Sequence, residues 1–397
     1  MKSRTWNLPP LEPGVILPVG LLLGVGLTFV WSTTHDHSGF LWAKQLLFVL
    51  LGLGAAGFVM RLGVERLVHL AYPIYFGLVI VLVLLPVMGE SSGGLTQRWI
   101  QLPFGLKLQP SEFMKWGLML ALARHLQHRG VTDTWRSYLF PFLLAVVPWF
   151  LVMRQPDLGS SLVMLPVFVA MLFVSGARPK HVMSLAAATA VLIPLAYFSP
   201  GVLEPYQKDR VDAFLQPIPS LIEEAKALHQ DRRHEPARAI EKQVSQLKQG
   251  TGRQQFYAVV AMGSGGLLGD GLGQGTQNAG NLLPVQHTDF IFAIIGEEWG
   301  LGGTVLVLFL FGSLVTGILS VAHRTREPFG RLLCVGVAVS LGMQAILHLG
   351  INAGILPVTG LTLPLVSYGG SSIVASLLAV GCVLDVARRK TVVFFEQ

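Results

Sequence analysis

The segment GVILPVGLLLGVGLTFVWS, residues 14–32, contains no charged side chain and decides the class of the fold. At 1.5 Å per residue, an α-helix of about 20 residues crosses a hydrocarbon core that is roughly 30 Å thick. A lone segment in lipid must satisfy its own backbone hydrogen bonds, which favours a helix. The run is longer than the core of a signal peptide, and no small-residue cleavage site follows it. We therefore interpret it as a retained transmembrane helix.

Similar apolar runs recur along the whole chain, which is 52% hydrophobic and only 13% charged, with a mean hydropathy of +0.58. Soluble domains carry about 25% charged residues. The predicted spans are 14–32, 41–60, 68–88, 111–127, 138–154, 157–175, 181–199, 288–321, 331–350 and 371–387. The pattern predicts an all-α integral membrane protein, a polytopic bundle of about ten transmembrane helices that forms a single membrane domain over 1–397. Because the eighth run is too long for one perpendicular crossing, we expect it to tilt or to begin outside the lipid.

Every second connection between the spans is basic, and both termini belong to the same set. The residues are Lys2, Arg4, Arg61, Arg66, Arg124, Arg129, Arg136, Arg178, Lys180, Arg324, Arg326, Arg331, Arg388, Arg389 and Lys390. The positive-inside rule then predicts cytoplasmic termini and an even number of spans. This topology accounts for most of the net charge of +7, so we expect no nucleic-acid partner. Cys334 and Cys382 lie inside apolar runs and form neither a disulfide framework nor a metal cluster.

The remaining connections are predicted to face outward, and the longest, 200–287, is a large extracytoplasmic loop between the seventh and eighth spans. Within it, 218–249 is rich in Glu, Lys, Arg, Ala and Gln, with apolar residues at helical spacing. This stretch predicts either an insertion of two short amphipathic helices, at the membrane surface or under a partner, or a solvated insertion.

Polar motifs gather on the outward side. Glu112 and Lys115 share a helical face in QPSEFMK (109–115), either as a local ion pair or facing a polar cavity. Ser111 is placed to cap the fourth helix. In QPDLGSS (155–161), Asp157 or Ser160 is placed to cap the sixth helix.

Two further motifs lie later in the chain. Asp289 opens the apolar run in HTDFIFAIIGEE (287–298), either stabilised at a helix N-terminus or acting as a general base. Glu297 and Glu298 lie deeper, and we expect at least one to belong to a buried network. The segment LPVTGLTLPLVSYGGSS (356–372) breaks the helix at membrane depth, either as a structural re-entrant turn or as the lining of a groove for a lipid-linked head group.

Together these motifs, with QRW (97–99) and AMGSGG (261–266), resemble the SEDS family of shape, elongation, division and sporulation proteins, which includes RodA and FtsW. The resemblance covers essentially the whole chain, and AMGSGG favours the RodA branch. It implies a peptidoglycan glycosyltransferase of the bacterial cytoplasmic (inner) membrane. Such enzymes polymerise lipid II on the outer face and work with a class B penicillin-binding protein that cross-links the strands.

The resemblance also assigns residues. The aspartate required for polymerisation falls on Asp289, and substrate positions fall on Glu112, Lys115, Trp99 and Arg210. Ser367, Gly369 and Gly370, with Asp157, belong to the family's structural motifs. The chain departs from the family's Gly-Tyr-Gln-x-x-Gln-Ser pattern at Arg253, Tyr257 and Ala258.

The expected chemistry is a single inverting displacement with Asp289 as base and no enzyme nucleophile. Arg210, Lys115 and Arg98 are candidates for binding the leaving diphosphate, and a divalent cation such as Mg²⁺ is a plausible helper. Three alternatives stay open: a lipid II flippase, a non-catalytic scaffold of the cell-wall synthesis complex, and an FtsW-like role in division rather than a role in elongation and cell shape.

Overall fold

The structure is a computed structural model of the chain. It describes residues 12–34, 40–88, 90–91, 97–102, 106–127, 136–155, 157–184, 205–215, 251–276 and 286–393, with the single positions 187, 223 and 227. Apart from positions 223 and 227, the predicted insertion at 218–249 lies outside these ranges, as does most of the predicted seventh span, 181–199.

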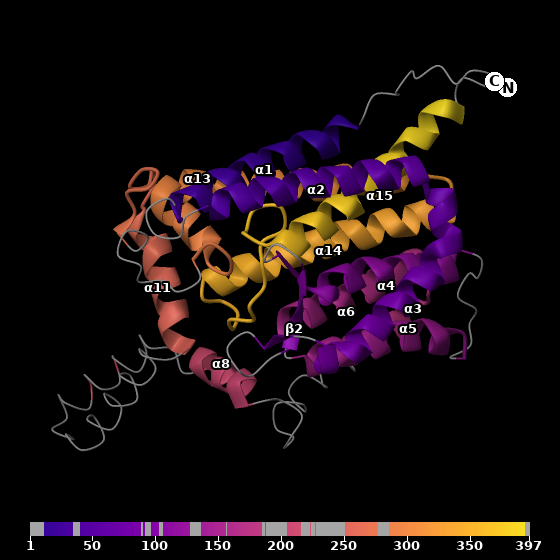
Figure 1. Cartoon of the computed structure of the whole chain (residues 1–397), viewed down its shortest axis with the longest axis horizontal. Coiled ribbons are helices and arrows are strands. Elements are labelled where there is room, and N and C mark those ends of the chain that lie inside the picture. The colour runs from indigo at the N-terminus through magenta and orange to yellow at the C-terminus, as the bar shows by residue number, and fades with distance from the viewer. Residues whose placement is uncertain are drawn as a thin grey trace.

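Long helices make up the described part of the chain (Figure 1). They are α1 (Pro13–Ser32), α2 (Leu41–Leu62), α3 (Val64–Met88), α4 (Pro110–Leu126), α5 (Arg136–Arg154), α6 (Leu158–Val174), α13 (Ile291–Arg324), α14 (Pro328–Asn352) and α15 (Gly370–Val393). Two shorter helices, α8 (Pro205–Leu215) and α11 (Thr251–Ser264), precede α13. Within the described residues, 7 helices are long and apolar enough to cross a membrane, and α6 is a shorter apolar helix. The predicted polytopic helical membrane fold is confirmed.

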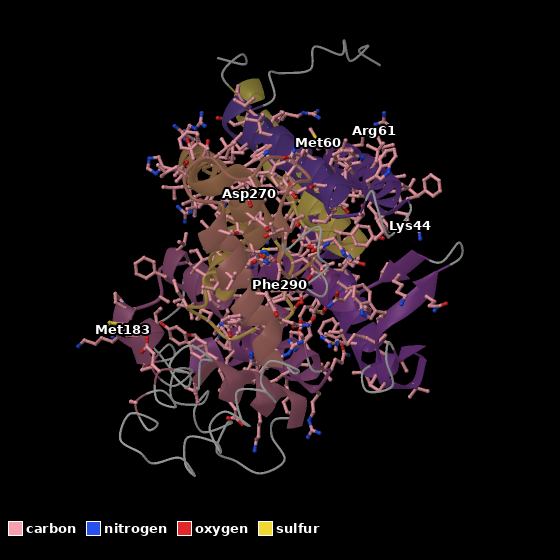
Figure 2. The ribbon with its side chains drawn as sticks, turned by 90° about the vertical axis from the view of Figure 1, so that its left-hand side faces the viewer. Lys44, Met60, Arg61, Met183, Asp270 and Phe290 are labelled. Atoms are coloured by element: carbon pink, nitrogen blue, oxygen red, sulfur yellow. The ribbon has the colours of Figure 1, made fainter. Side chains whose placement is uncertain are left out.

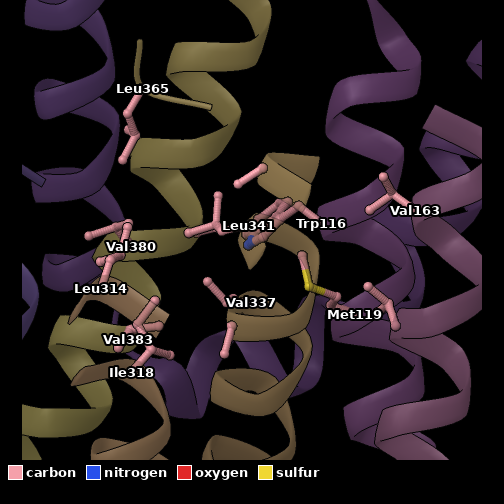
Figure 3. Packing of buried hydrophobic residues seen from close by; sticks show 14 of the residues in the cluster. Trp116, Met119, Val163, Leu314, Ile318, Val337, Leu341, Leu365, Val380 and Val383 are labelled. Atoms are coloured by element: carbon pink, nitrogen blue, oxygen red, sulfur yellow. The ribbon is translucent and has the colours of Figure 1, made fainter. Parts of the chain in front are cut away.

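The helices differ in what surrounds them. The outer helices present large apolar side chains to the surroundings, such as Leu50 and Phe58 of α2, which are 58% and 66% exposed. In α4, by contrast, almost every side chain is buried. Trp116 and Met119 of α4 pack among the side chains of α6 and α14 (Figure 3). Because α4 contacts protein on all sides, it can carry charged residues that a lipid-facing helix would exclude.

The predicted eighth span, α13, is broken rather than simply tilted. Gly300 adopts φ 63° and ψ −155°, so the helix is interrupted there. The 265–271 loop, which contains the end of AMGSGG, satisfies backbone groups on both sides of the break. The Leu301 N–H donates to Gly266 O at 2.9 Å, and the Gly271 N–H donates to Glu298 O at 3.0 Å. Such pairing is what permits irregular backbone at membrane depth.

A small antiparallel sheet is an addition that the sequence did not predict. It consists of β1 (Glu90–Ser91), β2 (Gln97–Leu102) and β3 (Leu106–Leu108), in the order β1-β2-β3. Ile100 pairs with Leu108 in the second ladder. The sheet lies in the Gly-rich connection between α3 and α4, and it positions the QRW motif.

Ion pairs join the basic connections at one end of the bundle. Arg324, at the end of α13, pairs with Glu12 beside the start of α1 at 2.6 Å, and Arg389 of α15 pairs with Glu65 of α3 at 2.6 Å. Exposed pairs of this kind stabilise a protein by at most about 1 kcal/mol. They nevertheless place the start of α1 and the end of α15 at one end, as Figure 1 also shows. This geometry agrees with the predicted topology, in which both termini lie on the same side.

Candidate functional site

The candidate base lies at the opposite end, in the turn that leads into α13. Phe290, Ile291 and Ile294 follow Asp289 and are fully buried, which anchors this turn in the bundle. Figure 2 views the molecule from this end and shows Phe290 near the centre of the view. The Asp289 side chain is only half-buried. The buried apolar residues after Asp289 therefore hold its carboxylate at this end of the bundle.

Arg210 approaches Asp289 across the 353–369 loop. Its Nη1 donates to Val358 O at 3.3 Å. A Cβ built on Gly360 would lie 3.4 Å from Arg210 Nη1 and 3.6 Å from Asp289 Oδ2, so these two atoms are at most 7.0 Å apart. Gly360 has φ 73°, a conformation that favours glycine. The loop thus places Gly360 beside both the predicted base and a predicted cation.

The charges around Asp289 come from separate parts of the chain. Burial raises the pKa of Asp289, while Arg210, a hydrogen bond with the Thr288 side chain and the charge of Arg98 oppose this shift, and Asp157 adds to it. Burial dominates, so the carboxylate is a stronger base than a free aspartate. The structure therefore gathers four of the predicted site residues, Asp289, Arg210, Arg98 and Asp157, within electrostatic reach of one another.

Asp157 forms the N-cap of α6, as predicted. Its Oδ1 accepts from Ser160 N at 3.1 Å, and its Oδ2 accepts from Gln109 Nε2 at 2.8 Å and from Ser111 Oγ at 2.7 Å. The prediction that Ser111 caps the fourth helix is wrong, because α4 begins at Pro110 after Gln109 and has no side-chain cap. Ser111 instead joins α4 to α6 through the Asp157 carboxylate.

Lys115 and Glu112 form a buried ion pair. Lys115 Nζ lies 2.9 Å from Glu112 Oε1, and both side chains are 6% exposed. Nζ also donates to Gln344 Oε1 of α14 at 2.9 Å. Lys115 is not among the groups that perturb Asp289. The geometry favours the local ion pair, and binding of diphosphate by Lys115 stays a prediction.

The remaining predicted residues lie around this centre. Trp99 is in β2, where it pairs with Glu90. Ser367 Oγ donates to Thr288 O at 2.7 Å, which ties the 356–372 segment to the turn before α13. Gly369 donates its N–H to Gln45 Oε1 at 3.4 Å. Gly370 opens α15, where any side chain would overlap the ring of Phe48.

The two deeper carboxylates belong to buried networks, as predicted. Glu298 accepts from Ser32 Oγ at 2.7 Å, and Glu297 accepts from Thr276 Oγ1 at 3.3 Å. Among the residues that the structure describes, no group of three or more His, Cys, Asp or Glu side chains could hold a metal ion.

A polar row on α14 was missed by the sequence analysis. Ser340, Gln344, His348 and Asn352 follow one another at a spacing of four and are each at most 4% exposed. This spacing puts them on one helical face. Polar residues recurring every fourth position inside an apolar run are a signal that would have found them.

A family model and two known proteins place these features in context. The family model described as "Cell cycle protein", which groups FtsW, RodA and SpoVE, matches residues 14–392. The probable peptidoglycan glycosyltransferase FtsW of Geobacter metallireducens is 34% identical over 375 residues, which cover 93% of this chain and 91% of that protein. Stage V sporulation protein E of Bacillus subtilis is 33% identical over 381 residues, which cover 94% of this chain and 93% of that protein.

Solved structures agree over the same extent. A chain from "Structural coordination of polymerization and crosslinking by a peptidoglycan synthase complex" has a TM-score of 0.75 at 32% identity, covering 96% of this chain and 98% of that chain. The rod shape determining protein RodA of Thermus thermophilus has a TM-score of 0.66 at 29% identity, with coverage of 96% and 98%. With its polytopic helical fold and its outward motifs, the chain belongs to the SEDS family of FtsW, RodA and SpoVE and is a membrane glycosyltransferase.

Proposed function

We propose that this chain polymerises lipid II into glycan strands at the outer face of the bacterial cytoplasmic membrane and releases undecaprenyl diphosphate. The observation that carries the proposal is the half-buried Asp289 carboxylate beside Arg210, at the end of the bundle opposite the basic connections. The relative named a probable peptidoglycan glycosyltransferase supports this substrate class.

In the proposed reaction, Asp289 accepts the proton of the acceptor's 4-hydroxyl as its oxygen attacks the anomeric carbon of the donor. The new glycosidic bond forms while the bond to the diphosphate breaks, and the electron pair leaves with the diphosphate. An α-linked donor becomes a β-linked product in one inverting step, which needs no covalent enzyme intermediate. The raised pKa of Asp289, caused chiefly by burial, makes the carboxylate a better proton acceptor near neutral pH.

The leaving diphosphate requires positive charge, and we propose that Arg210 and Arg98 supply it, since the charges of both act on Asp289. A divalent cation such as Mg²⁺ would neutralise diphosphate charge, and such ions bind through one or two carboxylates together with substrate phosphates. Both oxygens of Asp157 already accept hydrogen bonds within the protein, and Asp289 is the proposed base, so such an ion would be held chiefly by the diphosphate oxygens.

Replacing Asp289 with Asn tests the assignment of the base. Purified variant and wild-type proteins would be supplied with lipid II on the accessible side, and glycan polymer would be measured. General base catalysis typically contributes about 10²–10⁴-fold, so we expect a loss of that size. Full activity in Asp289→Asn would refute the base assignment. A wild-type protein that translocates lipid II but makes no polymer would identify a flippase, and one that does neither would support a scaffold.

We further propose that the enzyme works with a class B penicillin-binding protein. The support is a similar chain from the structure that describes polymerisation and cross-linking by a peptidoglycan synthase complex. Co-purification of the full-length chain with the candidate transpeptidase from the same membrane tests this proposal, and failure of every class B protein of the organism to co-purify would contradict it.

The cellular role divides into two candidates. We propose a role in elongation and cell shape, supported by AMGSGG and by the likeness to RodA. A division role is favoured by the relatives named FtsW. Depletion separates them: loss of an elongation enzyme gives rounded cells, whereas loss of a division enzyme gives filaments.

A further inference from the structure

We propose that Asn352, together with Ser367, is a positioning residue that fixes the backbone of Asp289 for catalysis. The inference rests on the proposed function of Asp289 as the base. The two side chains donate to main-chain carbonyl oxygens and not to the Asp289 carboxylate. Both act on the main chain that carries the carboxylate.

Three consecutive carbonyl oxygens around Asp289 each accept a hydrogen bond from a different donor on the 352–368 part of the chain. We call this set the carbonyl clamp. Its bonds run from Tyr368 N to His287 O at 2.9 Å, from Ser367 Oγ to Thr288 O at 2.7 Å, and from Asn352 Nδ2 to Asp289 O at 3.1 Å. The peptide planes before and after the Asp289 Cα are therefore both held, which restricts the direction of its side chain.

Asn352 is unusually well suited to this task. It is the last residue of α14 and is 0% exposed. Its Nδ2 donates to Asp289 O and to His348 O, the latter at 2.8 Å, and its Oδ1 accepts from Ala293 N at 3.0 Å. An amide supplies two donors and an acceptor from one side chain. Asn352 thus joins the end of α14 to both the turn at Asp289 and the first turn of α13.

Ser367 supplies the second side-chain donor from a different element. Its Oγ accepts from Leu363 N at 2.8 Å while it donates to Thr288 O. Its own carbonyl accepts from Gln45 Nε2 of α2 at 3.0 Å. The clamp is therefore anchored to α2 and to α14, so the position of Asp289 is set by the packed bundle rather than by the turn alone.

Geometry of this kind matters because a base acts only within hydrogen-bond reach of the proton it removes. A misplacement of about 1 Å can cost about 10²-fold in rate. We expect Asn352→Ala and Ser367→Ala each to lower kcat by about 10- to 100-fold, with KM changed by no more than about twofold. We expect KM to be nearly unchanged because both substitutions leave Arg210 and Arg98, the proposed diphosphate-binding residues, in place.

A shift in the pH dependence of kcat distinguishes a positioning role from partial unfolding, which would lower the activity without shifting its pH dependence. Asp289 faces Arg210, Arg98 and Asp157, and burial is the main cause that raises its pKa. Loosening the clamp admits water, so the acid limb of kcat should move to lower pH in both variants. Tyr75→Phe is the matched control, because it removes one buried hydroxyl donor, 2.8 Å from Leu144 O, far along the chain from the site.

The experiment measures lipid II polymerisation against pH for the full-length wild type, both clamp variants, Tyr75→Phe and Asp289→Asn, each normalised to folded protein. Lower kcat with a shifted acid limb in the clamp variants, and neither change in Tyr75→Phe, supports the proposal. Should Asn352→Ala fail to fold, Ser367→Ala decides by the same criteria. A clamp variant with wild-type kcat and an unmoved limb overturns it, whereas an active Asp289→Asn overturns the proposed function instead.

Discussion

The buried pair of Lys115 and Glu112 allows stability and catalysis to be separated in one mutant cycle. Lys115 Nζ makes two hydrogen bonds of 2.9 Å, to Glu112 Oε1 and to Gln344 Oε1. If Lys115 is replaced by Met, the Glu112 carboxylate keeps Ser160 Oγ, at a long 3.4 Å, as its described partner. The substitution therefore leaves a buried carboxylate without its counter-charge.

The expected free energies follow from this geometry. Breaking a buried ion pair by removing one partner costs about 3–5 kcal/mol, because an uncompensated charge stays behind. In the double variant, Glu112→Gln with Lys115→Met, no charge is left, and the loss is that of the two hydrogen bonds, about 1 kcal/mol each. We therefore expect Lys115→Met to lose about 3–5 kcal/mol and the double variant only about 2 kcal/mol.

The free energy of unfolding would be measured by denaturant titration of the purified proteins in mixed micelles, alongside lipid II polymerisation. A double variant that is less stable than Lys115→Met would refute the reasoning, as would a Lys115→Met protein as stable as the wild type. Activity adds a second result. If the double variant regains stability but not polymerisation, Lys115 contributes to the reaction itself, whereas recovery of both identifies a structural pair.

Four further predictions concern the site and the helix break. Burial raises the pKa of Asp289 and Arg210 is the largest opposing influence, so Arg210→Gln should move the acid limb of polymerisation to higher pH in a pH–rate profile. A raised pKa in the folded state means that the ionisation of Asp289 destabilises the folded protein as the pH rises. Asp289→Asn should therefore be at least as stable as wild type in thermal unfolding at pH 7. Gly360→Ala, at φ 73°, should lose about 1–2 kcal/mol of unfolding free energy and also lower kcat, because the methyl group enters between Arg210 and Asp289. Gly300→Ala should lose at least about 2 kcal/mol of unfolding free energy, measured as reduced membrane expression and thermal stability. The φ of 63° and ψ of −155° at this position suit glycine, and a Cβ there would lie 2.5 Å from Gly269 N.

The helical architecture could be predicted because each span carries its own signal. Charge-free runs such as 14–32 specify a helix in lipid without reference to the rest of the chain, and they match α1 and its counterparts. Helix α4 was also predicted, over 111–127, although it carries Glu112 and Lys115, because the rest of the run is largely apolar. The small sheet at 90–108 was missed because short strands in a Gly-rich connection lack a clear alternating pattern.

Contacts between distant segments were the part that sequence could not supply. The break at Gly300 depends on a loop about thirty residues earlier in the chain that donates and accepts the missing hydrogen bonds, and no local pattern specifies that pairing. The same applies to Arg210 and Asp289. Family resemblance named both residues, but only the path of the 353–369 loop brings them to either side of Gly360.

The misassigned Ser111 shows why polar residues near helix ends are ambiguous. A serine at the start of a predicted helix, 111–127, has the right chemistry for a cap. The helix in fact begins one residue earlier, at Pro110, and the Asp157 carboxylate offers a charged acceptor 2.7 Å from Ser111 Oγ. A charge-assisted hydrogen bond is roughly twice as strong as a neutral one. Within a bundle, a polar side chain therefore bonds across helices where a carboxylate is near, and its function is read from its partner rather than from its place in the helix. Asn352 follows the same logic, since its importance lies in the Asp289 carbonyl that it holds.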